Sequence, residues 1–213
     1  HSSHRRQRQM CIRDSVYTVT SNVANGQLEL TTNAGVAITS FTQDDLDNNR
    51  VVYVHNSSET TTDSFDFEIS DATTNIGSAT FNISITPVND EPIGADNTVT
   101  TLEDAPYTFS TADFGFTDPN DTPSNNLQNV IITTIPSNGT LTLNGVAVTA
   151  GQAVSAADIA SNLLVFTPVA NANGAGYDSF TFQVQDDGGT ANTGVDTDPV
   201  SYTHLTLPTM RTV

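Results

Sequence analysis

The chain has 213 residues, a formal net charge of −18, one Cys, no Trp and no Lys. Such an acidic chain is excluded as a binder of nucleic acid or of an anionic membrane surface, because both partners need cations that neutralise phosphate. It contains no apolar run of the ~20 residues that span a bilayer. Thr, Ser, Asn and Gly are abundant and favour strands and turns, so the composition predicts an extracellular all-β protein without a disulfide framework.

The two ends of the chain differ in composition from the middle. Residues 1–14 and 201–213 hold every Arg except Arg50, together with the Cys and both Met residues. A signal peptide is not expected at the start, because no apolar stretch of ~7–15 residues follows Arg13. The ends, with RRQRQMCIRDS and VSYTHLTLPT, resemble translated sequencing-library adapter; the alternative is a basic tail that pairs with the acidic body. We therefore expect two non-native tails, 1–14 and 201–213, that make no packed core.

An internal repeat organises the middle of the chain. Five blocks recur in the same order, the first three at a spacing of 113 residues and the last two at 115. The matching blocks are 19–30 with 132–143, Asp45-Leu46 with Asp158-Ile159, Val51–Tyr53 with Leu164–Phe166, Asp63–Phe65 with Asp178–Phe180, and Asp71 with Asp186. The repeat predicts one domain at 15–88 and a second at 96–200, joined by a linker at 89–95, and each domain has an ordinary size.

Several short strands are predicted in chain order within each domain. The turn dipeptides Asn25-Gly26 and Asn138-Gly139 precede segments in which Leu alternates with other residues. Short helical turns are expected at 43–48 and 155–162. Alternation along the strands predicts one buried face, and many short strands predict a β-sandwich. The side chains expected to be buried are Leu28, Leu30, Val52, Phe65, Phe67, Ile69, Phe81 and Ile83 in the first domain, and Leu141, Leu143, Val165, Phe180, Phe182 and Val184 in the second.

The repeat also predicts that both domains are incomplete. Strand candidates at 97–101 and 107–110 open the second domain, and their counterparts would fall before residue 1. The closing strand of the first domain, 79–87, would map forward onto the foreign tail. We therefore expect the first domain to lack its opening strand and the second to lack its closing strand.

Three motifs carry a resemblance to a known family. The segment Pro87–Pro92 between the domains is PVNDEP, residues 116–121 are FTDPND, and residues 176–188 are GYDSFTFQVQDDG. Together these motifs resemble the tandem cadherin-like repeats of large bacterial surface adhesins. The resemblance implies two tandem immunoglobulin-like β-sandwich repeats, dependence on Ca²⁺, and neighbouring repeats in a longer chain.

The acidic residues favour Ca²⁺ on chemical grounds as well. Ca²⁺ prefers six to eight oxygen ligands from carboxylates, amides and backbone carbonyls, and carboxylates that cluster without cations repel one another. Asn89 and Asp90 lie on the linker, Asp118 and Asp121 on a Pro- and Asn-rich loop, and Asp186 follows a strand. The resemblance implies that these five residues meet at the junction of the domains and bind the ion. The alternative is a set of solvated surface acids.

Two further ligands are implied by the resemblance alone. Glu103 would serve the junction after the second domain, and Asp71 would serve the junction before the first. The loop spacing Asp-x-x-Asp at Asp118 and Asp121 departs from the Asp-x-Asp of cadherins. A Ca²⁺ site is thus predicted with a loop that differs from the family pattern.

No catalytic set is expected, so the chain is predicted not to be an enzyme. His55 is the only His between the two tails, and a surface or packed position on a strand is favoured for it. The predicted function is that of calcium-stiffened extender repeats in a secreted or cell-surface bacterial adhesin, supporting cell adhesion. The alternatives are a module of the same fold that binds a polysaccharide or a cell-surface protein, and an ancillary domain of a secreted polysaccharide-degrading enzyme.

Overall fold

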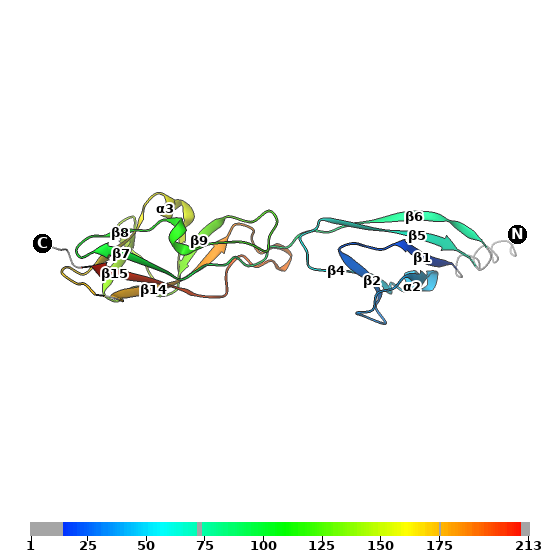
Figure 1. Ribbon diagram of the computed structural model, residues 1–213, viewed down its shortest axis with the longest axis horizontal. Coiled ribbons are helices and arrows are strands. Elements are labelled where there is room, and N and C mark those ends of the chain that lie inside the picture. The colour runs from blue at the N-terminus through cyan, green and yellow to red at the C-terminus, as the bar shows by residue number, and fades with distance from the viewer. Residues whose placement is uncertain (1–14, 72–73, 175, 210–213) are drawn as a thin grey trace. The chain divides into compact units, whose positions relative to one another are not determined.

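The computed structural model describes residues 15–71, 74–174 and 176–209, with the backbone alone for 205–209. The chain divides into two compact units, His1–Pro87 and Val88–Val213, called unit 1 and unit 2 below (Figure 1). Unit 2 thus includes the segment 89–95 that the sequence assigned to a linker. The predicted tail 1–14 lies outside the described residues.

Unit 1 is built from two antiparallel sheets. One has the strand order β3-β1-β5-β6, and the other is the pair β2-β4. β5 and β6 are the longest strands of unit 1 and run side by side (Figure 1). The elements are β1 (Val16–Ser21), β2 (Gly26–Leu30), β3 (Ser40–Thr42), α2 (Gln43–Asp47), β4 (Val51–His55), β5 (Thr62–Ser70) and β6 (Asn75–Ser84).

Unit 2 contains counterparts of these elements and adds two strands and a 3-10 helix at its start, together with the short strand β11 and a second 3-10 helix. Its sheets have the orders β12-β9-β14-β15-β7 and β11-β10-β13-β8, and only the β15–β7 pair is parallel. The elements are β7 (Asn97–Leu102), β8 (Tyr107–Thr108), η1 (Thr111–Phe114), β9 (Leu127–Ile132), β10 (Gly139–Leu143), β11 (Val146–Ala147), β12 (Gln152–Ser155), α3 (Ala156–Ala160), β13 (Leu164–Pro168), β14 (Asp178–Asp186), η2 (Ala191–Thr193) and β15 (Tyr202–Thr209).

The predicted all-β tandem sandwich is confirmed, and the repeat is visible in the order of the elements. β2 corresponds to β10, α2 to α3, β4 to β13 and β5 to β14. Each short helix starts at a hydroxyl cap, because Thr42 Oγ1 accepts from Asp45 N and Ser155 Oγ accepts from Asp158 N. The described part of unit 1 has no counterpart of β7 and β8. The described residues also contain no helix with the length and apolarity that membrane crossing requires.

The repeated Asn-Gly dipeptide is explained by a close approach between strands. A Cβ atom at Gly26 would overlap the carbonyl oxygen of Val54, and one at Gly139 would overlap the ring of Phe166. Both glycines start the strand that pairs with β4 or β13. The absence of a side chain lets the two strands meet there.

Unit 2 has a closed aromatic core between its sheets. Phe109 meets Phe180 edge-on with ring centroids 5.5 Å apart, and Phe114 meets Phe182 edge-on at 5.0 Å. These four rings are fully buried. The predicted burial of Leu141, Phe180, Phe182 and Val184 is confirmed, whereas Leu143 is half-buried. The predicted burial of Val165 is wrong in register, because its neighbours Leu164 and Phe166 face the core and Val165 is half-buried.

Unit 1 has a smaller and more open core. Leu28, Phe41 and Phe65 are its buried hydrophobic residues among those described. The predicted burial of Phe81 is wrong: its side chain is 55 % exposed although it stacks on Phe65 at 5.4 Å. The other residues predicted for this face are half-buried: Leu30, Val52, Phe67, Ile69 and Ile83. The outer side of the core therefore lacks a cover that unit 2 possesses.

The start of the predicted tail 201–213 takes part in the fold. Tyr202–Thr209 form β15, which pairs with β14 as β6 pairs with β5. His204 is fully buried, and its ring stacks on Phe180 at 5.2 Å. The prediction that this tail makes no packed core is therefore wrong for Tyr202 and His204, whose alternating side chains face the aromatic core.

Candidate metal centre

The five predicted ligands of the linker and its neighbouring loops all belong to unit 2. Asn89 and Asp90 lie near its start, Asp118 and Asp121 in the loop between η1 and β9, and Asp186 at the end of β14. The three loop and strand carboxylates are almost inaccessible, with exposures of 5 % for Asp118, 8 % for Asp121 and 1 % for Asp186. Burial of three acids at one end of a small domain is unusual for groups that prefer water.

Backbone pairing brings these segments together. Ile93 and Thr117 exchange two hydrogen bonds of 2.8 Å, which hold the start of unit 2 against the segment leading into the Asp118 loop. Val195 N donates to Asn89 O at 2.9 Å, which fixes the same start against the segment that follows β14. Residues distant in sequence therefore converge through main-chain contacts.

Side chains link four of the five residues in two pairs. Asn89 Nδ2 donates to both carboxylate oxygens of Asp186, at 3.1 and 3.3 Å. Asp90 N donates to Asp121 Oδ2 at 3.1 Å. Asn125, which the sequence did not single out, donates from its side chain to Asn89 Oδ1 and from its backbone to Asp118 Oδ2. Asn125 thereby connects Asp118 to the Asn89–Asp186 pair.

One oxygen in this group is left without a hydrogen-bond partner. Asp118 Oδ1 is buried and has none among the described residues. A buried acceptor without a donor costs about 1–3 kcal/mol, and more when it is charged. The described part of unit 2 contains no Lys or Arg that could pair with it.

The negative charge of Asp186 is also disfavoured, because this side chain is buried near other acids. Burial raises the pKa of Asp186, and the negative charges of Asp118 and Asp196 raise it further, while hydrogen bonds from Gly188 N and Asn89 oppose the rise. The ionised form of this carboxylate is therefore less stable in the fold than in water. A cation beside it would reverse that balance.

The oxygen atoms of these residues suit Ca²⁺ by their chemistry, but in this conformation they are not arranged as a complete coordination shell. They offer buried carboxylate oxygens, the amide oxygen of Asn89 and the unpartnered Asp118 Oδ1, which are the hard oxygen ligands that Ca²⁺ takes. Within the described ranges, however, no three His, Cys, Asp or Glu side chains are arranged to hold a metal ion. Ion binding would therefore require these side chains to rearrange.

The two remaining predicted ligands have local contacts of their own. Glu103 Oε2 accepts from Asn173 Nδ2 at 2.9 Å, next to the turn that joins β7 and β8. Asp71 Oδ1 accepts from Thr74 N at 2.7 Å, just after β5. Asp71 follows β5 in unit 1 as Asp186 ends β14 in unit 2.

Two acids that recur in the repeat have a structural role. Asp178 accepts hydrogen bonds from the backbone N–H groups of Ser137, Asn138 and Ser179 at 2.7–2.9 Å. Asp63 makes the equivalent contacts in unit 1 and is discussed below. The repeated Asp-Ser-Phe block thus braces the repeated Asn-Gly turn, and the constant spacing of the two blocks was the sequence signal for this contact.

His55 is a half-buried residue at the end of β4. Its Nε2 lies 2.9 Å from Thr60 Oγ1. This contact ties the strand end to the following loop.

The two sandwich units, the acidic composition and the carboxylate cluster of Asp118, Asp121 and Asp186 place this chain in the class of acidic, tandem β-sandwich repeats. The sequence profile of the Cadherin-like family matches residues 12–85 and 93–204, so the chain belongs to that family. The two matched stretches correspond to unit 1 and unit 2.

Three curated relatives are similar to this chain. It is 35 % identical over 175 residues to "Extracellular matrix protein 3" of Lytechinus variegatus, a match that covers 81 % of the chain and 5 % of the relative. It is 31 % identical over 173 residues to "FRAS1-related extracellular matrix protein 2" of Homo sapiens, covering 80 % and 5 %. It is 40 % identical over 76 residues to the human "Extracellular matrix organizing protein FRAS1", covering 35 % and 2 %. The chain thus spans about a twentieth of the length of the first two.

Proposed function

We propose that this chain is a pair of calcium-stiffened structural repeats from a secreted or cell-surface protein that supports adhesion. The observation that carries the proposal is the buried carboxylate cluster of unit 2, with the unpartnered Asp118 Oδ1 and no Lys or Arg in the described part of the unit. Membership of the Cadherin-like family and the names of the three relatives support an extracellular, structural role. Within that class, the motifs quoted from the sequence favour a bacterial surface adhesin.

The ion would act by removing an electrostatic cost. Asp118, Asp121 and Asp186 would hold Ca²⁺ through carboxylate oxygens, and Asn89 through its amide oxygen, with Asp90 as a further donor. Bound Ca²⁺ supplies the positive charge that the described part of unit 2 lacks. The segment that follows Pro87 would then be fixed to the Asp118 loop and to the end of β14, so the chain between the two repeats would lose freedom.

Asp71 and Glu103 are proposed as ligands at the other junctions of a longer array. The role proposed for Asp71 is supported by its position after β5, which corresponds to the position of Asp186 at the end of β14. The role proposed for Glu103 is supported by its position in the turn between β7 and β8. Each repeat would then contribute to an ion at either end, and the partners of this chain would be its neighbouring repeats.

Small-angle scattering tests the stiffening directly. The chain is measured with 2 mM EDTA and at increasing Ca²⁺, beside Asp118→Asn and the control Asp66→Asn, an exposed residue of β5 in unit 1. We expect Ca²⁺ to increase the maximum interatomic distance of the chain and of Asp66→Asn, as for a stiffer and longer particle, and to leave that of Asp118→Asn unchanged. An identical distribution at all Ca²⁺ concentrations for the unsubstituted chain would refute the proposed function.

A further inference from the structure

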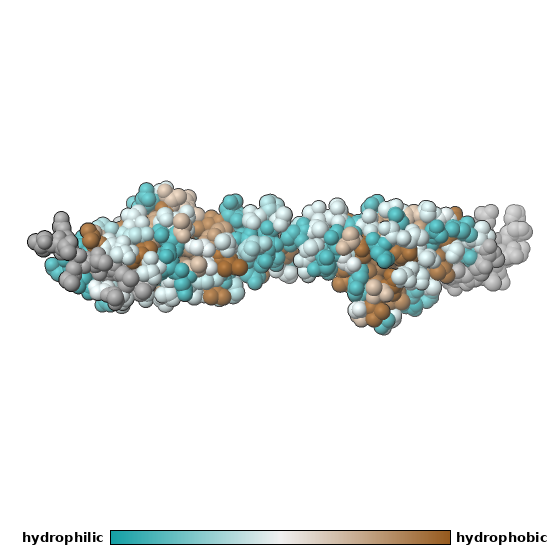
Figure 2. All heavy atoms as spheres, viewed as in Figure 1, coloured by the Kyte–Doolittle hydropathy of each residue, from teal (hydrophilic) through white to brown (hydrophobic). Residues whose placement is uncertain are grey.

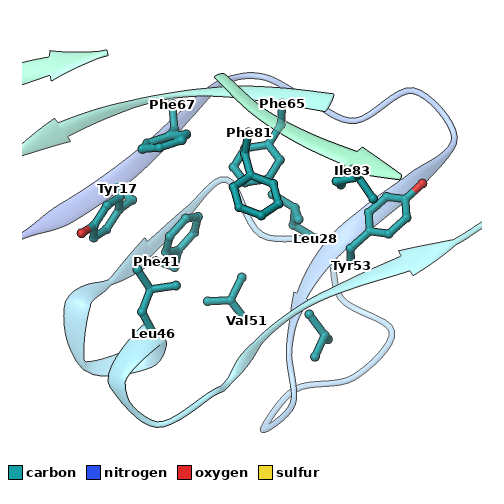
Figure 3. Close-up of a pocket in the computed structure, with 11 residues that line it drawn as sticks. Tyr17, Leu28, Phe41, Leu46, Val51, Tyr53, Phe65, Phe67, Phe81 and Ile83 are labelled. Atoms are coloured by element: carbon teal, nitrogen blue, oxygen red, sulfur yellow. The ribbon is translucent and has the colours of Figure 1, made fainter. Parts of the chain in front are cut away.

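Unit 1 contains an apolar hollow that opens to its surface. The hollow has a volume of about 310 Å³ and is lined by side chains of both sheets and of α2. Figure 3 shows the rings of Tyr17, Phe41, Phe65 and Phe81 pointing toward a common space above Val51. Figure 2 shows hydrophobic residues gathered on the surface of unit 1 over β2 and α2. A hollow of this composition is a candidate docking surface.

The equivalent space in unit 2 is filled by two aromatic side chains. Phe65 and Phe67 of unit 1 correspond to Phe180 and Phe182 of unit 2, on which Phe109 and Phe114 pack edge-on. Phe109 directly follows β8 and Phe114 is the last residue of η1, and the described part of unit 1 has no counterpart of either element. The hollow is therefore the space that these two rings would occupy.

The exposure of Phe81 follows from the same comparison. Phe81 pairs with Phe65 across β5 and β6, and His204 pairs with Phe180 across β14 and β15. The ring of His204 meets the ring of Phe109 at 4.8 Å and is fully buried. Phe81 occupies the equivalent position and is exposed because no ring covers it.

Unit 1 has a strand edge, that of β4, which corresponds to the edge of β13 that pairs with β8 in unit 2. In unit 2, β8 pairs with β13 at Tyr107–Phe166 and Thr108–Val165, and Phe109 N donates to Leu164 O at 3.0 Å. β4, the counterpart of β13, pairs only with β2 among the described strands. The outer edge of β4 is thus available for the hydrogen bonds that β8 makes in unit 2.

We propose that the hollow of unit 1 binds an extended polypeptide segment of the same kind as residues 97–116. Such a segment adds a short strand to the free edge of β4 and inserts two aromatic side chains, five residues apart, against Phe65 and Phe67. The repeat itself identifies this occupant, because unit 2 holds such a segment at the equivalent place. Addition of a strand together with side-chain anchors is a general mode of peptide recognition.

A synthetic peptide tests the proposal on the whole chain. A fluorescent peptide with the sequence of residues 97–116 is titrated with the chain and followed by anisotropy, in EDTA so that the outcome does not depend on Ca²⁺. We expect saturable binding of one peptide per chain. A peptide with Phe109→Ser and Phe114→Ser should bind at least tenfold more weakly, because both anchors are lost.

Chain variants locate the binding to the hollow. Phe81→Ser and Leu46→Ser alter lining residues that are already partly exposed, at 55 % and 37 %, and each should weaken binding at least fivefold while the circular dichroism spectrum stays the same. Ile76→Ser is the matched control, since Ile76 lies on β6 like Phe81, is 60 % exposed and does not line the hollow. It should leave binding unchanged.

Three results would overturn the proposal. One is the absence of saturable binding by the peptide. Another is equal binding by the peptide that lacks both Phe residues. The third is self-association of the chain, seen by analytical ultracentrifugation, that Phe81→Ser abolishes and Ile76→Ser does not, because this result would assign the hollow to a second copy of the chain.

Discussion

Replacing Asp63 with alanine should destabilise unit 1, because its carboxylate joins two segments that are distant in sequence. It accepts hydrogen bonds from Ala24 N at 3.0 Å, Asn25 N at 2.8 Å and Ser64 N at 2.8 Å. Tyr53 Oη donates to it as well, at 2.9 Å. Removal of the carboxylate frees the turn before β2 from the start of β5.

The size of the effect follows from the pKa of this group. Burial opposes the ionisation of Asp63, but the three backbone hydrogen bonds and the one from Tyr53 outweigh it and lower the pKa from 3.8 to about 2. At about 1.4 kcal/mol per pH unit, this difference corresponds to roughly 2.5 kcal/mol of charge-dependent stabilisation before solvent screening. Because the side chain is partly exposed, solvent screening reduces the expected loss to about 1–2 kcal/mol.

The sign of the pH dependence is fixed by the lowered pKa. The stabilisation is present above the unfolded pKa of about 4 and is lost as the pH falls through the folded value of about 2. The charge-dependent part of the difference between the chain and Asp63→Ala should therefore be full at pH 7, shrink as the pH falls below about 4, and be lost below pH 2.

Amide hydrogen exchange gives the stability of unit 1 separately from that of unit 2. Protection of the peptides that cover β2 and β4 should fall by a factor of about 5–30 in Asp63→Ala at pH 7, which corresponds to about 1–2 kcal/mol. The control Asp66→Asn changes an exposed acid on the same strand and should leave protection within twofold. Unchanged exchange in Asp63→Ala, or an equal loss in both variants, would refute the assignment of Asp63 as a brace.

Three further predictions concern unit 2. Burial lowers the pKa of His204, against an opposing effect of Asp113, so protonation favours the unfolded state. The free energy of unfolding should therefore fall as the pH drops below about 6.5. His204→Phe should remove this pH dependence in urea unfolding curves measured from pH 7.5 to 5.5. Phe109→Ala should cost about 3–5 kcal/mol in the same curves, whereas Val146→Ala, at a residue that is 72 % exposed, should cost less than about 0.5 kcal/mol. Gly139→Ala should lower the thermal midpoint, because the added methyl group meets the ring of Phe166, and an unchanged midpoint would contradict the close approach described for that turn.

The sequence predicted the parts of the fold that depend on local pattern. Alternation identified the buried faces of β10 and β14, where Leu141, Phe180 and Phe182 lie in the core. It failed at Val165, because a run of four apolar residues, 163–166, has no alternation from which to choose a face. Register there is set by pairing with β10 on one side and β8 on the other.

Two other outcomes depend on contacts that no local pattern encodes. Phe81 has the pattern of a core residue, but its burial requires a covering segment that the described part of unit 1 does not contain. The sequence also suggested which acids lie near one another, while the link through Asn125 and the isolation of Asp118 Oδ1 arise from loop conformation. Composition marked residues 201–213 as foreign, yet β15 pairs with β14, and the rings of Tyr202 and His204 pack on the aromatic core.

Calorimetric titration with Ca²⁺ tests the central claim, that the buried carboxylates of unit 2 bind this ion. The chain, Asp186→Asn, Asp118→Asn and the control Asp66→Asn are titrated at pH 7.4. We expect saturable binding to the chain and to Asp66→Asn, and affinity reduced at least tenfold in Asp186→Asn and in Asp118→Asn, because each variant loses a charged ligand from a site with few ligands. Affinity equal in all four proteins, or no saturable binding to the unsubstituted chain, would show that these carboxylates do not bind Ca²⁺.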